Sequence, residues 1–264
     1  MLNEPFFSVK IEANSCNYEI LINDFKIVQE ARGYPMNSEL LFNEWISEPI
    51  SIIKVTASPL PNQTIMDEEA TVSIKIFSCE KSDKEQKRKT EVLSFTSPSF
   101  LANNQREPAK IYTETKSFET KLPFSTLLSN TNIFKIDNDT VETIVSTYRK
   151  IHQLFKNKDI DAIKKEIAIR EQEYATVYYD SLDLRISNTL ILIEKYFADN
   201  NLELWEFAPQ HFLPKLYAFG KIITMADTKN FSPIFMINKK ERKTINFPFY
   251  FARRSNQEEL IILR

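Results

Sequence analysis

The stretch LFKNKDIDAIKKEIAIREQEYATVYYD (residues 154–180) carries the longest helical pattern in the chain. Apolar residues recur in it every three or four positions, at Ile160, Ile163, Ile167 and Tyr174, and this spacing places them on one face of a helix. Asp159 precedes the pattern, and its side chain is a suitable N-terminal cap. The stretch therefore predicts an amphipathic helix that packs against a core.

Arg170 occupies a position of that apolar stripe where another apolar residue is expected. Two interpretations remain open. Its guanidinium group either points into a pocket, ready to bind a carboxylate in bidentate fashion, or pairs with Glu166 or Glu173 while the stem packs at the margin of the stripe. Tyr174 and Tyr178 continue the stripe, and they are candidate pocket residues together with Arg170.

Two further helices are predicted on either side of this one. In the first, an apolar face runs from Val141 to Phe155, and Asp139 followed by Glu142 resembles a capping box. The other covers SLDLRISNTLILIEKYFA (181–198), which is apolar nearly all round. That distribution predicts burial from more than one side.

The region before the helices alternates apolar and polar residues, as half-buried strands do. Asn23 and Asp24 indicate a turn within residues 17–30, and residues 30–49 form a crossing with a helical turn around Leu41–Trp45. The expected strands cover residues 6–13, 17–30, 50–57, 70–78, 91–97 and 110–122. Six or seven short strands with polar spacers predict an antiparallel β-sandwich over residues 1–130.

After the helices the sequence returns to strands. Residues 214–227 are apolar on both faces, which predicts a central position in a sheet. The segments SPIFMIN and TINFPFYFA flank the basic tip KKERK (239–243) and indicate a hairpin, and LIILR closes the chain. The predicted class is therefore α+β, with residues 131–264 forming a second domain of three helices followed by a β-meander.

Composition excludes several kinds of site. The chain has only two glycines, Gly33 and Gly220, so a glycine-rich phosphate loop cannot be written. The motifs HxH, HExxH, CxxC and GxSxG are all missing from the sequence, so we expect no metal, no cofactor and no catalytic residue of these types. The net charge of −2 does not favour nucleic-acid binding, although residues 81–89 and 239–243 are basic tips.

The sequence also bears on compartment. Cys16 and Cys79 are more consistent with two free buried thiols than with a disulfide. No apolar run is long enough for a membrane span, and no signal peptide is evident at the start. We therefore expect a cytoplasmic protein, with a removed leader as the alternative.

The most ligand-like segment is LWEFAPQHFLPKLYAFG (204–220), which concentrates aromatic side chains around one titratable group. Trp205, His211 and Tyr217 are candidate residues of a small-molecule pocket. The alternative interpretation is an aromatic loop that plugs the junction between two domains.

From residue 140 onward the chain resembles the nuclear-transport-factor-two-like family, a cone-shaped α+β fold. The resemblance rests on IHQLFKNKDIDAIKKEI, a helix followed by a short polar break and a second helix, and on the later apolar strands. It implies a ligand or catalytic site at the mouth of the cone, at Tyr174, Tyr178, Trp205 or His211. The third helix is longer and more apolar than that family's pattern.

Two functions follow from these observations. The preferred one is a non-enzymatic module that binds another protein through the helical face or the sandwich edge, as bacterial immunity or accessory proteins do. Self-association into a homo-oligomer is a further alternative. The second function is a small-molecule binder or an enzyme with a pocket in the C-terminal domain, where His211 and Tyr174 or Tyr178 supply the polar groups.

Overall fold

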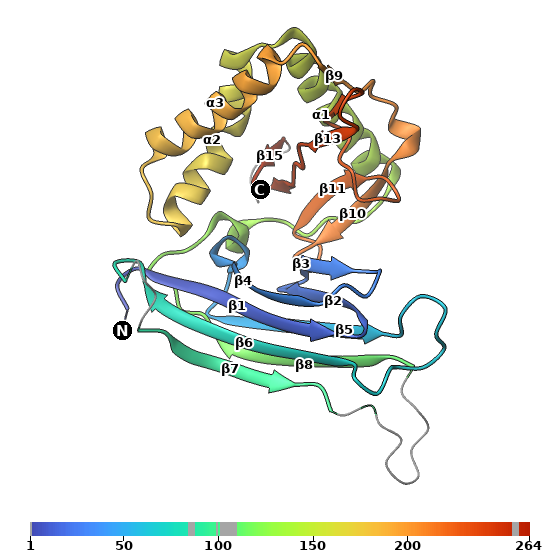
Figure 1. The fold of residues 1–264 in the computed structure, drawn as a ribbon. Coiled ribbons are helices and arrows are strands. Elements are labelled where there is room, and N and C mark those ends of the chain that lie inside the picture. Colours follow the sequence, from blue (N-terminus) through green and yellow to red (C-terminus); the bar gives the residue numbers. More distant parts are fainter. Residues whose placement is uncertain (1, 84–87, 99, 101–109, 255–258) are drawn as a thin grey trace. The chain divides into compact units, whose positions relative to one another are not determined.

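The structure is a computed structural model, and it describes residues 2–83, 88–98, 100, 110–254 and 259–264. The chain divides into two compact units, Met1–Ser125 and Thr126–Arg264. The strand pairs of both units are antiparallel, and the three α-helices lie in the second unit (Figure 1). The predicted α+β class is confirmed.

The first unit consists of two four-stranded sheets. One sheet has the order β4-β1-β6-β7 and the other the order β3-β2-β5-β8. The strands are β1 (Pro5–Asn14), β2 (Asn17–Ile22), β3 (Phe25–Glu30), β4 (Met36–Leu41), β5 (Ile50–Ser58), β6 (Thr71–Glu80), β7 (Thr90–Thr96) and β8 (Tyr112–Glu119). Alternate residues of β1, β2, β5 and β6 are buried in one shared apolar core, which makes the unit a β-sandwich.

Strand β4 was not predicted from the sequence. Residues 30–49 were expected to form a connection that crosses the sandwich. Its six residues are half-buried or exposed without alternation, because it forms the outer edge of its sheet beside β1. The helical turn expected around Leu41–Trp45 is a 3-10 turn, η1, at Asn43–Trp45. Because both faces of β4 are largely exposed, its sequence lacks the alternation of apolar and polar residues by which a strand is recognised.

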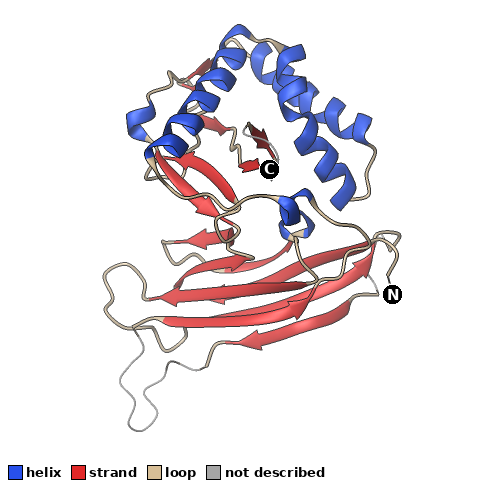
Figure 2. Ribbon diagram, turned by 180° about the vertical axis from the view of Figure 1, so that it is seen from behind, coloured by secondary structure: helices blue, strands red, loops and turns tan. Residues whose placement is uncertain are grey.

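The second unit contains α1 (Asn138–Asn157), α2 (Ile160–Val177) and α3 (Leu182–Ala198), drawn in blue in Figure 2. Two short 3-10 turns are η2 (Leu127–Asn130) and η3 (Pro209–His211). The strands are β9 (Leu202–Leu204), β10 (Leu213–Tyr217), β11 (Ile222–Ala226), β12 (Phe235–Asn238), β13 (Lys243–Asn246), β14 (Phe251–Arg253) and β15 (Leu260–Ile262). They form the sheets β10-β11-β14-β15 and β13-β12-β9.

The core of the second unit lies between the helices and these sheets. The inner face of α1 buries Ile144, Tyr148, Ile151 and Phe155. The hydroxyl of Tyr148 is 2.9 Å from the carbonyl oxygen of Phe249, to which it donates. A polar group so deep in the core is tolerated because it is hydrogen-bonded.

Helix boundaries follow local capping. Asp159 caps α2 as expected, since its carboxylate accepts from the N–H of Ala162 at 3.0 Å. The cap of α1 is Asp137, whose carboxylate accepts from the N–H of Thr140 at 2.9 Å. The prediction of Asp139 as that cap was wrong by two residues, because the helix begins at Asn138 and both aspartates suit a first turn.

Helix α3 also departs from expectation. Leu184 and Ile191 each expose 58% of their surface and Leu192 exposes 47%, so burial from more than one side was wrong. Only Ile193 and Phe197 are buried in this helix. An apolar pattern on all sides of a helix does not indicate which side faces the core, and α3 contacts the core on one side only.

The segment 214–227 is a hairpin, of which only β11 is internal to its sheet. Ala218, Phe219 and Gly220 all adopt positive φ angles at the turn. The central position predicted for the whole segment was therefore wrong for β10, which lies at an edge. The hairpin predicted around 239–243 is confirmed by the pairing of β12 with β13.

Candidate functional site

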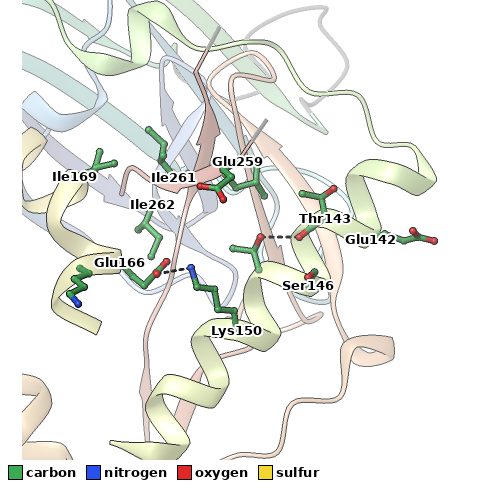
Figure 3. A pocket seen from close by; sticks show the side chains of 12 residues that line it. Glu142, Thr143, Ser146, Lys150, Glu166, Ile169, Glu259, Ile261 and Ile262 are labelled. Carbon is green, nitrogen blue, oxygen red and sulfur yellow. Dashed lines mark hydrogen bonds and ion pairs between the residues drawn. The ribbon is translucent and has the colours of Figure 1, made fainter. Parts of the chain in front are cut away.

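A cavity of about 690 Å³ opens between α1, α2 and β15 in the second unit (Figure 3). Helix α1 contributes Glu142, Thr143, Ser146, Thr147 and Lys150. The other lining residues are Lys165, Glu166 and Ile169 of α2, followed by Glu259, Leu260, Ile261 and Ile262. A floor of branched aliphatic side chains thus meets a rim of charged and hydroxyl groups.

The face of α1 that lines the cavity borders its buried face. The lining positions recur one turn apart in two neighbouring rows, 142, 146 and 150 in one and 143 and 147 in the other, so their side chains share one face of the helix. The hydroxyl of Thr143 donates to the carbonyl oxygen of Asp139 at 2.7 Å, and that of Thr147 donates to Thr143 at 2.9 Å. Both threonine hydroxyl protons are therefore used within the helix.

One ion pair joins the two helices beside the cavity. The ammonium nitrogen of Lys150 lies 2.7 Å from a carboxylate oxygen of Glu166, as the dashed line in Figure 3 shows. Of these side chains, 62% of Lys150 and 28% of Glu166 is exposed. Water therefore screens the pair, and a ligand can reach the remaining hydrogen-bonding positions of the lysine.

Strand β15 presents its edge to the cavity. Four consecutive residues, Glu259 to Ile262, line the space, although successive side chains of a strand point to opposite faces. A surface that includes all four of them must run along the edge of the strand. β15 pairs with β14 on its other side and ends the sheet.

None of the six residues that the sequence singled out lines this cavity. Arg170 binds the neighbouring Glu171, with its Nε 2.9 Å from Oε1, rather than Glu166 or Glu173. Of these side chains, 16% of Arg170 and 3% of Glu171 is exposed. The guanidinium group also lies 6.0 Å from the ring centre of Phe249, so the charge is held at the edge of the core.

Tyr174 and Tyr178 are brought together by α2. Their rings stack with centres 6.1 Å apart, and the guanidinium of Arg185 lies 5.6 Å from the first ring and 5.0 Å from the second. Arg185 also pairs with Asp180 at 2.6 Å. These contacts of Arg185 stabilise the turn between α2 and α3.

The other three candidates lie outside α2, and each has ring contacts or exposure of its own. Trp205 exposes 46% of its surface and stacks on Phe235 with ring centres 5.7 Å apart. His211 is exposed in η3. Tyr217 meets the ring of Tyr250 edge to face at 5.8 Å. The structure gives no support to a pocket that encloses His211.

Burial raises the pKa of several groups outside the cavity, among them two tyrosines and a cysteine. The pKa of the Tyr148 phenol is about 12, because the ring is wholly enclosed. The pKa of Tyr250 is raised for the same reason, with smaller contributions from neighbouring tyrosines. Cys16 is a free buried thiol, as Cys79 is, and burial raises its pKa to about 11. A thiol of this kind is unreactive at neutral pH.

Sequence reasoning missed the cavity residues for an identifiable reason. Thr143, Ser146 and Lys150 look like an ordinary solvated helix face, and LIILR looks like any short terminal strand. The basic tip at residues 81–89 lies partly outside the described residues, which omit 84–87. In the part of the chain that is described, no group of three potential metal ligands occurs, and no helix has the length and apolarity to cross a membrane.

Comparisons with protein-family models, with curated proteins and with solved structures gave no match. The resemblance to the nuclear-transport-factor-two-like family stays a prediction. Any functional conclusion must therefore come from the geometry of the chain itself.

Proposed function

We propose that this chain is a non-enzymatic protein-binding module, which takes up an extended segment of a partner protein beside the free edge of β15. The observation that carries the proposal is an uncharged sheet edge facing a cavity. Extended segments bind such edges through main-chain hydrogen bonds, and side-chain pockets add specificity. The expectation of an immunity or accessory role fits this mode of binding, and the partner's identity stays a prediction.

The free edge of β15 carries main-chain N–H and C=O groups that can bind a partner strand. The N–H of Leu263 donates to the carbonyl oxygen of Tyr250 at 2.8 Å, toward β14. Hydrogen bonding alternates along an antiparallel strand, so the main-chain groups of Leu260 and Ile262 point to the other side. Among the described residues, no hydrogen bond to these outward groups is found.

Other sheet edges of this protein are protected by charge. Among the described strands that end a sheet, charged residues occur in β3 (Lys26, Glu30), β4 (Glu39), β7 (Glu91), β8 (Glu114, Lys116, Glu119), β9 (Glu203), β10 (Lys215) and β13 (Lys243). Charges on an edge strand discourage pairing with another chain. Within the described strands β15 is the exception, because Leu260–Ile262 contains no charged residue.

The space fits a short strand. One strand residue rises about 3.3 Å, in a layer about 4.8 Å wide and about 10 Å deep, so it needs roughly 160 Å³. A cavity of about 690 Å³ therefore holds roughly four extended residues.

The test begins with peptides selected from a displayed library of random twelve-residue sequences. Binding of each labelled peptide is measured by fluorescence anisotropy, and each peptide is then N-methylated at one position at a time. We expect affinity to fall at every second position, because alternate amides of an added strand bond to the edge. Selection of no binder, or losses without this alternation, would contradict the proposal.

A matched pair of variants locates the binding. Ser146 lines the cavity and Gln153 does not, and both are exposed on α1. We expect Ser146→Arg to weaken binding at least tenfold by filling the cavity, and Gln153→Arg to change it less than twofold. Equal effects of the two substitutions would place the peptides elsewhere on the protein.

A further inference from the structure

The charges around the cavity are separated along its length. Glu259 lies on the side of the first turns of α1, whereas Lys150 lies about two turns further along that helix from Glu142, whose own side chain points away from the cavity (Figure 3). Glu259 has a formal charge of −1. Lys150 and Lys165 together with Glu166 have a formal charge of +1. A ligand in the cavity therefore meets a negative end and a positive end.

The separation corresponds to a length of strand. Glu142 and Lys150 are eight residues apart on one helix, which is about 12 Å at about 1.5 Å per residue. Four residues of an extended chain span about 13 Å, and residues four apart point to the same face. A single bound strand can therefore place one side chain at each end of the cavity.

The strand β15 fixes a direction for this pattern. Glu259 immediately precedes β15 and lies at the negative end. Strand pairs in this sheet are antiparallel, so a strand added in the same way begins beside Ile262 and ends beside Glu259. Its first residues then lie near Lys150 and its last residues near Glu259.

We infer that the bound segment runs antiparallel to β15 and carries an acidic residue followed, four positions later, by a basic residue. This inference rests on the proposed function. The acidic side chain reaches Lys150, whose ammonium group has three donors and spends one on Glu166. The basic side chain reaches Glu259. Residues between them are β-branched, because they lie along Ile169 and Leu260.

Three labelled heptapeptides of alternating valine and threonine test the order of charges. The first has glutamate second and lysine sixth, the next has the two exchanged, and the last has glutamine at both places. We expect the acid-first peptide to bind at least about fivefold more tightly than its isomer, as two partly exposed ion pairs allow. The difference should shrink in 1 M salt, because screening weakens exposed pairs.

Reversing the charges of the protein should reverse the preference. In the double variant Lys150→Glu, Glu259→Lys we expect the base-first peptide to bind more tightly. Lys156→Glu is the control, since Lys156 is exposed on α1 and does not line the cavity. Circular dichroism confirms that each variant is folded before binding is measured.

The outcomes separate the two proposals. Equal binding of both isomers, or tighter binding of the base-first peptide to the unchanged protein, overturns the inferred order and leaves strand addition intact. Failure of all three peptides, together with the failure of library selection, overturns strand addition itself.

Discussion

The ammonium nitrogen of Lys150 lies 2.7 Å from a carboxylate oxygen of Glu166, and this contact links α1 to α2 beside the only strand edge without charge among those described. The pair stands beside the proposed binding edge, and 62% of the Lys150 side chain and 28% of the Glu166 side chain is exposed. The contribution of this pair to stability can be measured separately from its proposed contribution to binding.

The Lys150–Glu166 pair should contribute little to stability. We expect a double-mutant cycle with Lys150→Ala and Glu166→Ala to give a coupling free energy below about 1 kcal/mol, because exposed ion pairs are screened by water. Urea unfolding of the four proteins measures it. A coupling several times larger would mean that the helices depend on this pair.

The hydroxyl group of Tyr148 should contribute to the stability of the fold. This group is 2.9 Å from the hydroxyl of Thr224 and donates to the carbonyl oxygen of Phe249. We expect Tyr148→Phe to lower the free energy of unfolding by about 0.5–1.5 kcal/mol, the usual range for a buried hydrogen bond. The loss stays modest because Thr224 still donates to Phe249. Chemical denaturation of both proteins tests it, and an unchanged midpoint would contradict it.

Alkaline pH should destabilise the protein through the same residue. The pKa of Tyr148 is 10.0 in its unperturbed state and about 12 when folded, so above pH 10 the unfolded chain loses this proton first. Stability therefore falls as pH rises from about 10 to about 12. Urea midpoints between pH 8 and pH 11.5 should fall less steeply in Tyr148→Phe. Buried Tyr250 and Cys16 also have raised pKa values, so part of the slope remains.

Two isoleucines of α3 should differ sharply in how much each stabilises the protein. Ile193 exposes 5% of its surface and Ile191 exposes 58%. We expect Ile193→Ala to cost about 2–4 kcal/mol of unfolding free energy, from lost burial and a cavity. Ile191→Ala should stay within about 0.5 kcal/mol. Thermal and urea unfolding compare the two. Similar losses would show that the exposed face of α3 is packed in solution.

The local features were predictable. Asp159 caps α2, and the sandwich strands follow the period-two pattern, because each depends on residues close in the chain. The α1 cap was predicted at Asp139 and lies at Asp137, because both aspartates suit a first turn. Strand β4 was missed because an exposed edge has no alternation to read.

The candidate site was not predictable. Arg170 attracted attention as a charge in an apolar stripe, yet it binds Glu171, its own neighbour in the chain. The cavity is made instead by Thr143, Lys150 and Glu259, which lie more than one hundred residues apart at the extremes. Nothing in the local pattern of any one of them marks a site.

The sequence by itself determined where the three helices and the alternating strands of the sandwich form, since hydrophobic period and capping act over a few residues. It also excluded a glycine-rich phosphate loop, because two glycines cannot make one. The tertiary structure alone decided which strand ends a sheet, which face of α3 meets solvent and which charges stand around β15. Those properties depend on what packs against each element, and that partner is supplied by distant parts of the chain.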